Sequence, residues 1–157
     1  MGEKFYHKRI KKELKKLAEI SGRYLKVWIE KKVPIPHPNQ ELVFHYKPEA
    51  ILVTKTGKRI IFEVLDDQLT DHNLIIADII QSYLVENVSK VIFISKNKTG
   101  SEKTQKYCSI IGKILEEKGF FKKEIPEVIV YTITYSEVRS TGRLAKILKK
   151  FSKKDGW

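Results

Sequence analysis

The chain has 157 residues, of which 41% are hydrophobic and 32% are charged, and this composition excludes a wholly disordered chain. No apolar run approaches the roughly 20 residues of a membrane-spanning helix, so the sequence predicts that this is not a transmembrane protein. The polar, lysine-rich N-terminus has no apolar signal core, which favours a cytoplasmic over a secreted protein. The single cysteine, Cys108, excludes an internal disulfide or a cysteine zinc cluster, and its apolar neighbours predict a place in the core.

The net charge of +12 is concentrated at the two ends of the chain. Residues 1–26 carry nine Lys or Arg against three acids, and residues 139–157 carry seven against one, so each end has a net charge of +6. Such a basic balance favours a polyanionic partner, with nucleic acid first. The predicted nucleic-acid-binding residues are Lys8, Arg9, Lys12, Lys15, Lys16, Arg139, Arg143, Lys146 and Lys150.

The first half of the chain predicts one helix followed by strands. Its predicted elements are a helix over 4–21, strands over 24–32, 42–46, 50–55 and 58–65, and an irregular segment with three prolines over 33–39. In the first strand, alternation predicts that Leu25, Val27 and Ile29 share one face. The dipeptide Thr56-Gly57 predicts a hairpin turn between the last two strands.

The second half alternates helices and strands. Its predicted elements are a helix over 72–86, a buried strand over 88–95, a helix over 101–118 with Ser101 as N-cap, a strand over 127–135, and a basic amphipathic helix over 140–152. Trp157 is expected in a disordered tail. The whole pattern predicts one α+β domain over 1–157, with a mixed β-sheet flanked by helices.

A local excess of acids interrupts this basic chain. Residues 60–89 contain no Lys or Arg but six acids, Glu63, Asp66, Asp67, Asp71, Asp78 and Glu86. An enzyme that acts on phosphates with a divalent cation, Mg²⁺ or Mn²⁺, needs such carboxylates as ligands. The alternative is an acidic surface that only balances the basic ends.

Three polar residues of the 72–86 segment share one side of the predicted helix. At 100° per residue, Asp78, Ser82 and Glu86 fall on a narrow stripe opposite the apolar residues. Carboxylates stacked in this way repel each other unless a cation lies among them. Glu86 also falls in the predicted last turn, where the helix dipole disfavours a carboxylate by about 0.3–1 kcal/mol. Glu86 and Asp78 are therefore candidate catalytic and metal-binding residues, and the alternatives are an exposed helix end and an ordinary polar face.

The order helix, strand, strand, strand, helix, strand resembles the core of the PD-(D/E)xK nucleases. That family has an Asp near the start of the second core strand and an acid-x-Lys on the third. The matching positions here are Pro48-Glu49 and Glu63-Val64-Leu65, so Glu replaces Asp and Leu65 stands where the catalytic Lys is expected. The resemblance implies Glu49 and Glu63 as further site residues, and the alternative is that Glu63 merely ends a strand.

The lysine-rich opening, residues 1–8, and the segment 77–86 resemble a family of small nucleases encoded by Acidianus filamentous viruses. These are double-stranded DNA viruses of acidothermophilic archaea, and low Asn, Gln, Met and Cys contents are typical of hyperthermophiles. The resemblance implies an α+β fold remotely similar to nucleotidyltransferases, action on linear double-stranded DNA in the host cytoplasm, and Glu86 as the catalytic carboxylate.

The sequence thus predicts a nuclease that hydrolyses linear double-stranded DNA with Mg²⁺ or Mn²⁺. Its predicted catalytic residues are Glu86, Asp78 and Glu63, with Glu86 and Asp78 as metal ligands. The alternative is a non-enzymatic DNA-binding protein, for which the basic ends suffice. A nucleotidyltransferase is disfavoured because the Gly-Ser loop followed by paired acids is missing. The sequence indicates no obligate protein partner.

Overall fold

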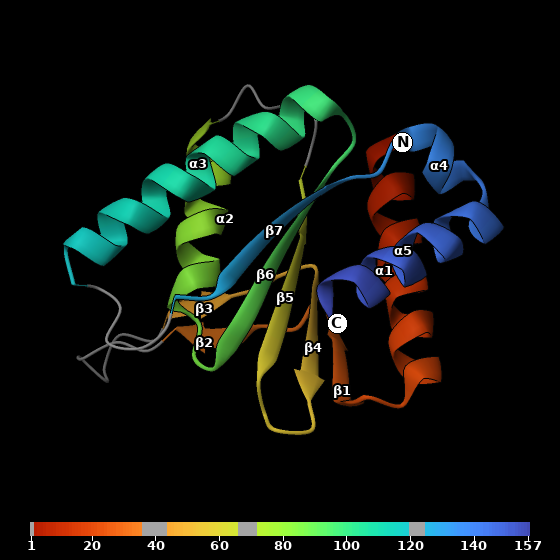
Figure 1. Cartoon of the computed structure of the whole chain (residues 1–157), viewed down its shortest axis with the longest axis horizontal. Coiled ribbons are helices and arrows are strands. Elements are labelled where there is room, and N and C mark those ends of the chain that lie inside the picture. The colour runs from red at the N-terminus through yellow and green to blue at the C-terminus, as the bar shows by residue number, and fades with distance from the viewer. Residues whose placement is uncertain (1, 36–43, 66–71, 120–124) are drawn as a thin grey trace.

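The fold is built on a mixed five-stranded sheet with helices on both faces (Figure 1). The computed structural model describes residues 2–35, 44–65, 72–119 and 125–157. The helices are α1 (Gly2–Ser21), α2 (His72–Leu84), α3 (Lys98–Glu117), α4 (Tyr135–Arg139) and α5 (Thr141–Asp155). The strands are β1 (Tyr24–Ile29), β2 (Val33–Ile35), β3 (Phe44–Tyr46), β4 (Ala50–Thr54), β5 (Arg59–Val64), β6 (Val88–Ser95) and β7 (Glu127–Thr132). This architecture confirms the predicted α+β class.

The sheet has the strand order β1-β4-β5-β6-β7. Strands β1, β4 and β5 pair antiparallel, while β5, β6 and β7 pair parallel through the crossover helices α2 and α3. The β4–β5 hairpin follows the prediction, because Gly57 takes the positive φ of 83° that its turn requires. The beginning of β4 therefore lies at the same sheet edge as the end of β5, with Ala50 opposite Phe62.

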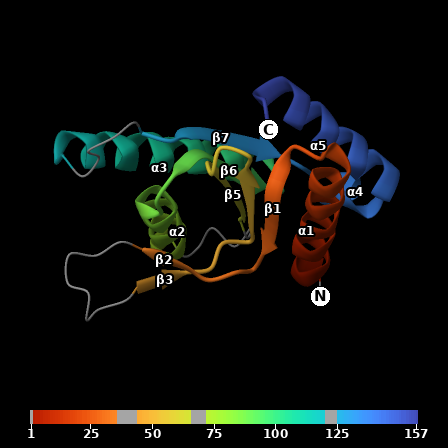
Figure 2. The same cartoon turned by 90° about the horizontal axis from the view of Figure 1, so that it is seen from below.

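Helices lie on both sides of the sheet (Figure 2), and each face has its own apolar core. Helices α1 and α5 cover one face with Tyr6, Ile10, Leu14, Leu144 and Leu148. Helices α2 and α3 cover the other face with Ile75, Ile79, Tyr83, Cys108 and Leu115. Strands β2 and β3 form a separate two-stranded ribbon, whose Val33 and Tyr46 pack with residues of β4 and β5. Within the described ranges, no helix combines the length and the apolar character needed to cross a bilayer.

Several predictions for the first half are wrong, among them the strand over 24–32, since β1 ends at Ile29. A β-bulge between Tyr24 and Lys26 leaves Leu25 outside the pairing, so this side chain is 62% exposed instead of sharing the face of Val27 and Ile29. Part of the segment predicted to be irregular is strand β2, in which Pro34 lies opposite His45. A two-stranded ribbon has only edge strands, where a proline without an N–H donor is tolerated.

The second half also departs from the prediction in several places. Helix α3 begins at Lys98, because the side chain of Asn97, and not that of Ser101, accepts the N-terminal hydrogen bond from Gly100 N, at 2.7 Å. Strand β7 ends at Thr132, and α4 follows behind a capping box of Thr134 and Glu137. Trp157 is not in a disordered tail.

Trp157 is instead buried against the sheet. Its side chain is 2% exposed, and its ring centroid lies 4.9 Å from that of Phe62. The indole nitrogen donates to the Tyr131 hydroxyl over 2.9 Å, while Arg23 Nη2 donates to the Trp157 carbonyl oxygen over 2.6 Å. These contacts fix the end of α5 on the face that α1 also covers.

Candidate functional site

The β4–β5 pairing brings two carboxylates together at one edge of the sheet. Glu49 directly precedes β4, and Glu63 lies near the end of β5. The backbone N–H of Glu49 donates to Oε1 of Glu63 over 2.8 Å, which ties the two residues directly. Glu63 is only 6% exposed. The two positions that the PD-(D/E)xK pattern singles out are therefore neighbours.

Asp78 joins them from the middle of α2. It is half-buried, and its charge interacts with those of Glu63 and Glu49. Burial, together with the Glu49 charge, raises the pKa of Asp78 to about 6. Burial and the Asp78 charge also raise the pKa of Glu63 well above its usual range, although the N–H of Glu49 partly offsets this. We call Glu49, Glu63 and Asp78 the carboxylate cluster.

Tyr46 of the β2–β3 ribbon lies against this cluster. It is 3% exposed, and its hydroxyl group makes no hydrogen bond of ordinary geometry with the described part of the chain. Burial and the nearby charges of Glu63 and Asp78 raise the pKa of this phenol, which therefore stays neutral. Interaction with this hydroxyl group in turn lowers the pKa of Glu63, in part against the effect of burial.

Helix α1 contributes two basic side chains to the same edge. Lys11 Nζ lies 3.1 Å from Glu49 Oε2 and 3.2 Å from Glu30 Oε1, and His7 Nδ1 lies 3.4 Å from Glu49 Oε1. Burial alone would raise the pKa of Glu49, but the hydrogen bonds and charges of His7 and Lys11 outweigh it and hold this pKa below its usual value. Glu49 is thus the ionised member of the cluster, while Glu63 and Asp78 retain protons to higher pH.

The donor set of the cluster is smaller than a complete protein cage for a divalent cation. Across the described ranges, no three side chains of His, Cys, Asp or Glu are arranged to enclose one metal ion. Mg²⁺, however, usually binds through one or two carboxylates and completes its shell with water and substrate phosphate oxygens. Glu63 and Asp78 supply two carboxylates for that mode, and the repulsion between their charges favours a cation. Asp66, Asp67 and Asp71 lie outside the described residues.

Glu86 lies elsewhere. Helix α2 ends at Leu84, two residues earlier than predicted, and Glu86 is exposed in the turn that follows. The carbonyl of the next residue, Asn87, accepts a hydrogen bond from the backbone N–H of Arg59 at the start of β5. Glu86 therefore lies near Arg59, at the opposite end of β5 from Glu63, and Arg59 and Glu63 are roughly 13 Å apart at about 3.3 Å per residue.

The polar stripe predicted for α2, made of Asp78, Ser82 and Glu86, does not form one continuous surface. Ser82, between Asp78 and Glu86, is fully buried, and its hydroxyl group donates to the Ile79 carbonyl over 2.7 Å. The fold thus brings Asp78 to Glu63 and Glu49, and leaves Glu86 apart from all three.

The two basic ends of the chain lie side by side, because α1 packs against α5 (Figures 1 and 2). All the predicted nucleic-acid-binding side chains are exposed except Arg9, which is half-buried and donates to the Arg139 carbonyl over 3.5 Å. Lys15 and Lys16 each pair at 4.0 Å with a glutamate of their own helix. We call these nine residues the terminal-helix surface: Lys8, Arg9, Lys12, Lys15, Lys16, Arg139, Arg143, Lys146 and Lys150.

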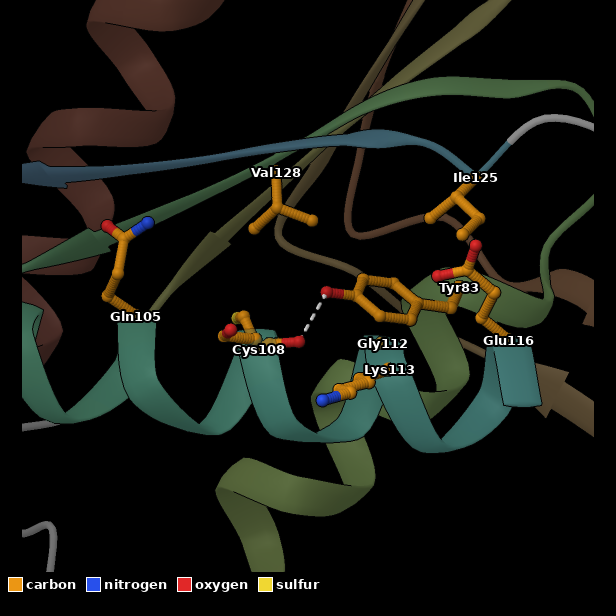
Figure 3. A pocket seen from close by; sticks show the side chains of 9 residues that line it. Tyr83, Gln105, Cys108, Gly112, Lys113, Glu116, Ile125 and Val128 are labelled. Atoms are coloured by element: carbon orange, nitrogen blue, oxygen red, sulfur yellow. Dashed lines mark hydrogen bonds between the residues drawn. The ribbon is translucent and has the colours of Figure 1, made fainter. Parts of the chain in front are cut away.

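A hollow between α2 and α3 offers no comparable chemistry (Figure 3). Tyr83 and Cys108 lie in it, and the Tyr83 hydroxyl donates to the Cys108 carbonyl over 3.4 Å. Burial raises the pKa of the Cys108 thiol to about 12, so it is not a reactive thiolate. The predicted core position of Cys108 is confirmed.

Sequence reasoning did not single out Tyr46, His7 or Lys11 as partners of the carboxylates. The spacing of four between His7 and Lys11 places both on one side of α1 and could have indicated a joint role. Tyr46 carries no local signal, because its proximity to Asp78 depends on how the ribbon packs. Comparison of the chain with protein-family models, with curated proteins and with solved structures finds no match.

Proposed function

We propose that the protein is a nuclease that hydrolyses phosphodiester bonds of linear double-stranded DNA at the carboxylate cluster. One observation carries the proposal. Three carboxylates from three segments of the chain meet beside Tyr46 and Lys11, and two of them have raised pKa values. Such strongly perturbed carboxylates gather at functional sites more often than elsewhere. The element order of the PD-(D/E)xK core supports the same reading.

The chain's own residues take distinct roles in this proposal. Glu63 and Asp78 would hold Mg²⁺ or Mn²⁺, which, when bound, supplies Lewis-acid activation of water and of the phosphate. Glu49 holds Lys11 at this edge, and the ammonium group of Lys11 stabilises negative charge on the phosphate. In the overall reaction, water attacks phosphorus, the bond from phosphorus to one sugar oxygen breaks, and that oxygen takes up a proton.

The terminal-helix surface would bind the DNA backbone. It borders the cluster through α1, the helix that also carries Lys11 and His7. Lys and Arg contacts to phosphates position DNA without reading its sequence.

The experiment that tests the proposal is incubation of the purified protein with linear duplex DNA. Degradation is expected with Mg²⁺ or Mn²⁺ and none in excess chelator. DNA that shifts in a gel but stays intact with either metal would contradict the nuclease and favour the non-enzymatic DNA-binding protein.

DNA affinity should fall steeply with salt, since each phosphate contact contributes a slope of about −0.9 in log K against log salt. Lys8→Gln combined with Lys12→Gln should reduce the magnitude of that slope by about 2 if both side chains contact phosphates. The measurement is fluorescence anisotropy of a labelled duplex in chelator. Lys113→Gln, an exposed position on α3, is the matched control and should leave the slope unchanged. An equal slope in the double variant would remove this part of α1 from the interface.

A further inference from the structure

Three cations surround one tryptophan on the edge strand β1. Lys31 Nζ lies 4.0 Å from the centroid of the Trp28 ring, Lys26 Nζ lies at 5.6 Å, and the guanidinium carbon of Arg59 lies at 5.7 Å. Within the described residues, none of these cations forms an ion pair, although Glu86 lies in the turn next to Arg59. Cation–π attraction offsets only part of the repulsion among three positive charges.

This cationic patch lies on the same sheet face as Glu63. The register places Trp28 opposite Ile51, and Ile51 opposite Ile61, two residues before Glu63. At about 4.8 Å between strands and about 3.3 Å per residue, Trp28 and Glu63 are roughly 12 Å apart. Lys26 and Arg59 belong to the same face, because both are paired with Val53. Trp28 is half-buried against the cluster that contains Ile51 and Tyr46.

We infer that Trp28 with Lys26, Lys31 and Arg59 forms a binding site for single-stranded nucleic acid. An unpaired base would stack on the indole ring in place of the Lys31 ammonium group, and the three cations would neutralise the adjacent phosphates. Bases within a duplex do not offer their faces for stacking, so the patch selects unpaired nucleotides. In a linear duplex these occur at frayed ends.

A role of this patch in catalysis rests on the proposed nuclease function. In that function, a frayed strand bound at Trp28 passes close to the carboxylate cluster. Binding itself does not depend on that function. Measurements in chelator therefore separate the two.

The test uses the intrinsic fluorescence of the full chain, which has two tryptophans. Trp157 is buried and hydrogen-bonded to Tyr131, so the Trp157→Phe variant isolates the Trp28 signal. The probe is an oligothymidylate of about 15 nucleotides, a length within the usual range of single-strand sites. Quenching of Trp28 by this probe, and weaker quenching by a blunt duplex of equal length, is the expected result. No quenching by the single strand would overturn the inference.

Substitutions then measure how much each side chain of the patch contributes to the affinity for single-stranded DNA. Trp28→Leu should weaken binding of the labelled oligothymidylate about five- to hundredfold, the loss expected for one stacked base. Lys31→Gln combined with Arg59→Gln keeps the indole in place, so this variant serves if Trp28→Leu fails to fold. It should reduce the salt slope by about 1.4 at about 0.7 per single-strand phosphate contact. Lys113→Gln is the control.

The outcomes distinguish the inference from the proposed function. Loss of single-strand binding in the patch variants supports the site even if wild-type protein cleaves no DNA, in which case only the nuclease proposal fails. Unchanged affinity in both patch variants overturns the site even if wild-type protein degrades DNA.

Discussion

Replacing Glu63 with Gln should lower the rate of DNA hydrolysis by at least about a hundredfold, the loss typical when one strong electrostatic contact is removed from a site. Gln keeps the size of the side chain and an oxygen that can accept the Glu49 N–H, but it lacks the charge that would hold a divalent cation. The measurement is the initial rate of loss of linear duplex DNA at saturating Mg²⁺ or Mn²⁺. DNA affinity in chelator should change little.

Two further variants are compared with Glu63→Gln in the same assay. Glu116→Gln changes an exposed carboxylate on α3 and should keep full activity. Glu86→Ala tests the resemblance to the viral nucleases, which implies loss of activity. Its folding stability should move by about 1 kcal/mol or less, because Glu86 is exposed and fills no core volume. Full activity of Glu63→Gln with an inactive Glu86→Ala would place the chemistry at the turn after α2 and would contradict the carboxylate cluster.

Asp78→Asn should make the protein more stable than wild type at about pH 8, by about 1–2 kcal/mol after allowance for partial exposure. The folded state raises the pKa of Asp78 from 3.8 to about 6, so the unfolded chain releases this proton first as pH rises. The contribution of Asp78 to the free energy of unfolding of the wild type is therefore present at low pH and is lost as pH rises through about 6. Asn cannot ionise, so the Asp78→Asn variant does not lose this contribution as pH rises. Urea unfolding of both proteins at about pH 4 and about pH 8 measures the difference, which should be small at the lower pH.

A pH-independent difference, or a less stable variant at about pH 8, would contradict the raised pKa of Asp78. The same proteins supply a readout of cation binding that needs no activity. Mg²⁺ or Mn²⁺ should raise the thermal midpoint of wild type at about pH 8, since a ligand that binds only the folded state stabilises it. Asp78→Asn and Glu63→Gln should show little of this gain. An equal gain in all three proteins would place the cation away from Glu63 and Asp78.

The sequence by itself determined those features whose signals are local. The turn at Gly57 and the apolar runs on both sides of it indicated the β4–β5 hairpin, and the apolar run of β6 indicated a buried strand, because these signals depend on neighbouring residues only. Cys108 in the core follows from its apolar neighbours on α3. Glu63 and Asp78 could be named as site candidates because acids stand out in a basic chain.

Only the tertiary structure decided which candidates meet. Helical spacing grouped Asp78 with Glu86, whereas α2 ends at Leu84 and packs on β6, the strand next to β5, so that the charge of Asp78 acts on Glu63. Tyr46 comes from a ribbon whose docking no local pattern encodes. Spacing within an element fixes which side chains share a face. The register and packing of distant segments fix what that face meets, because they depend on the free energy of burying all the apolar surfaces together.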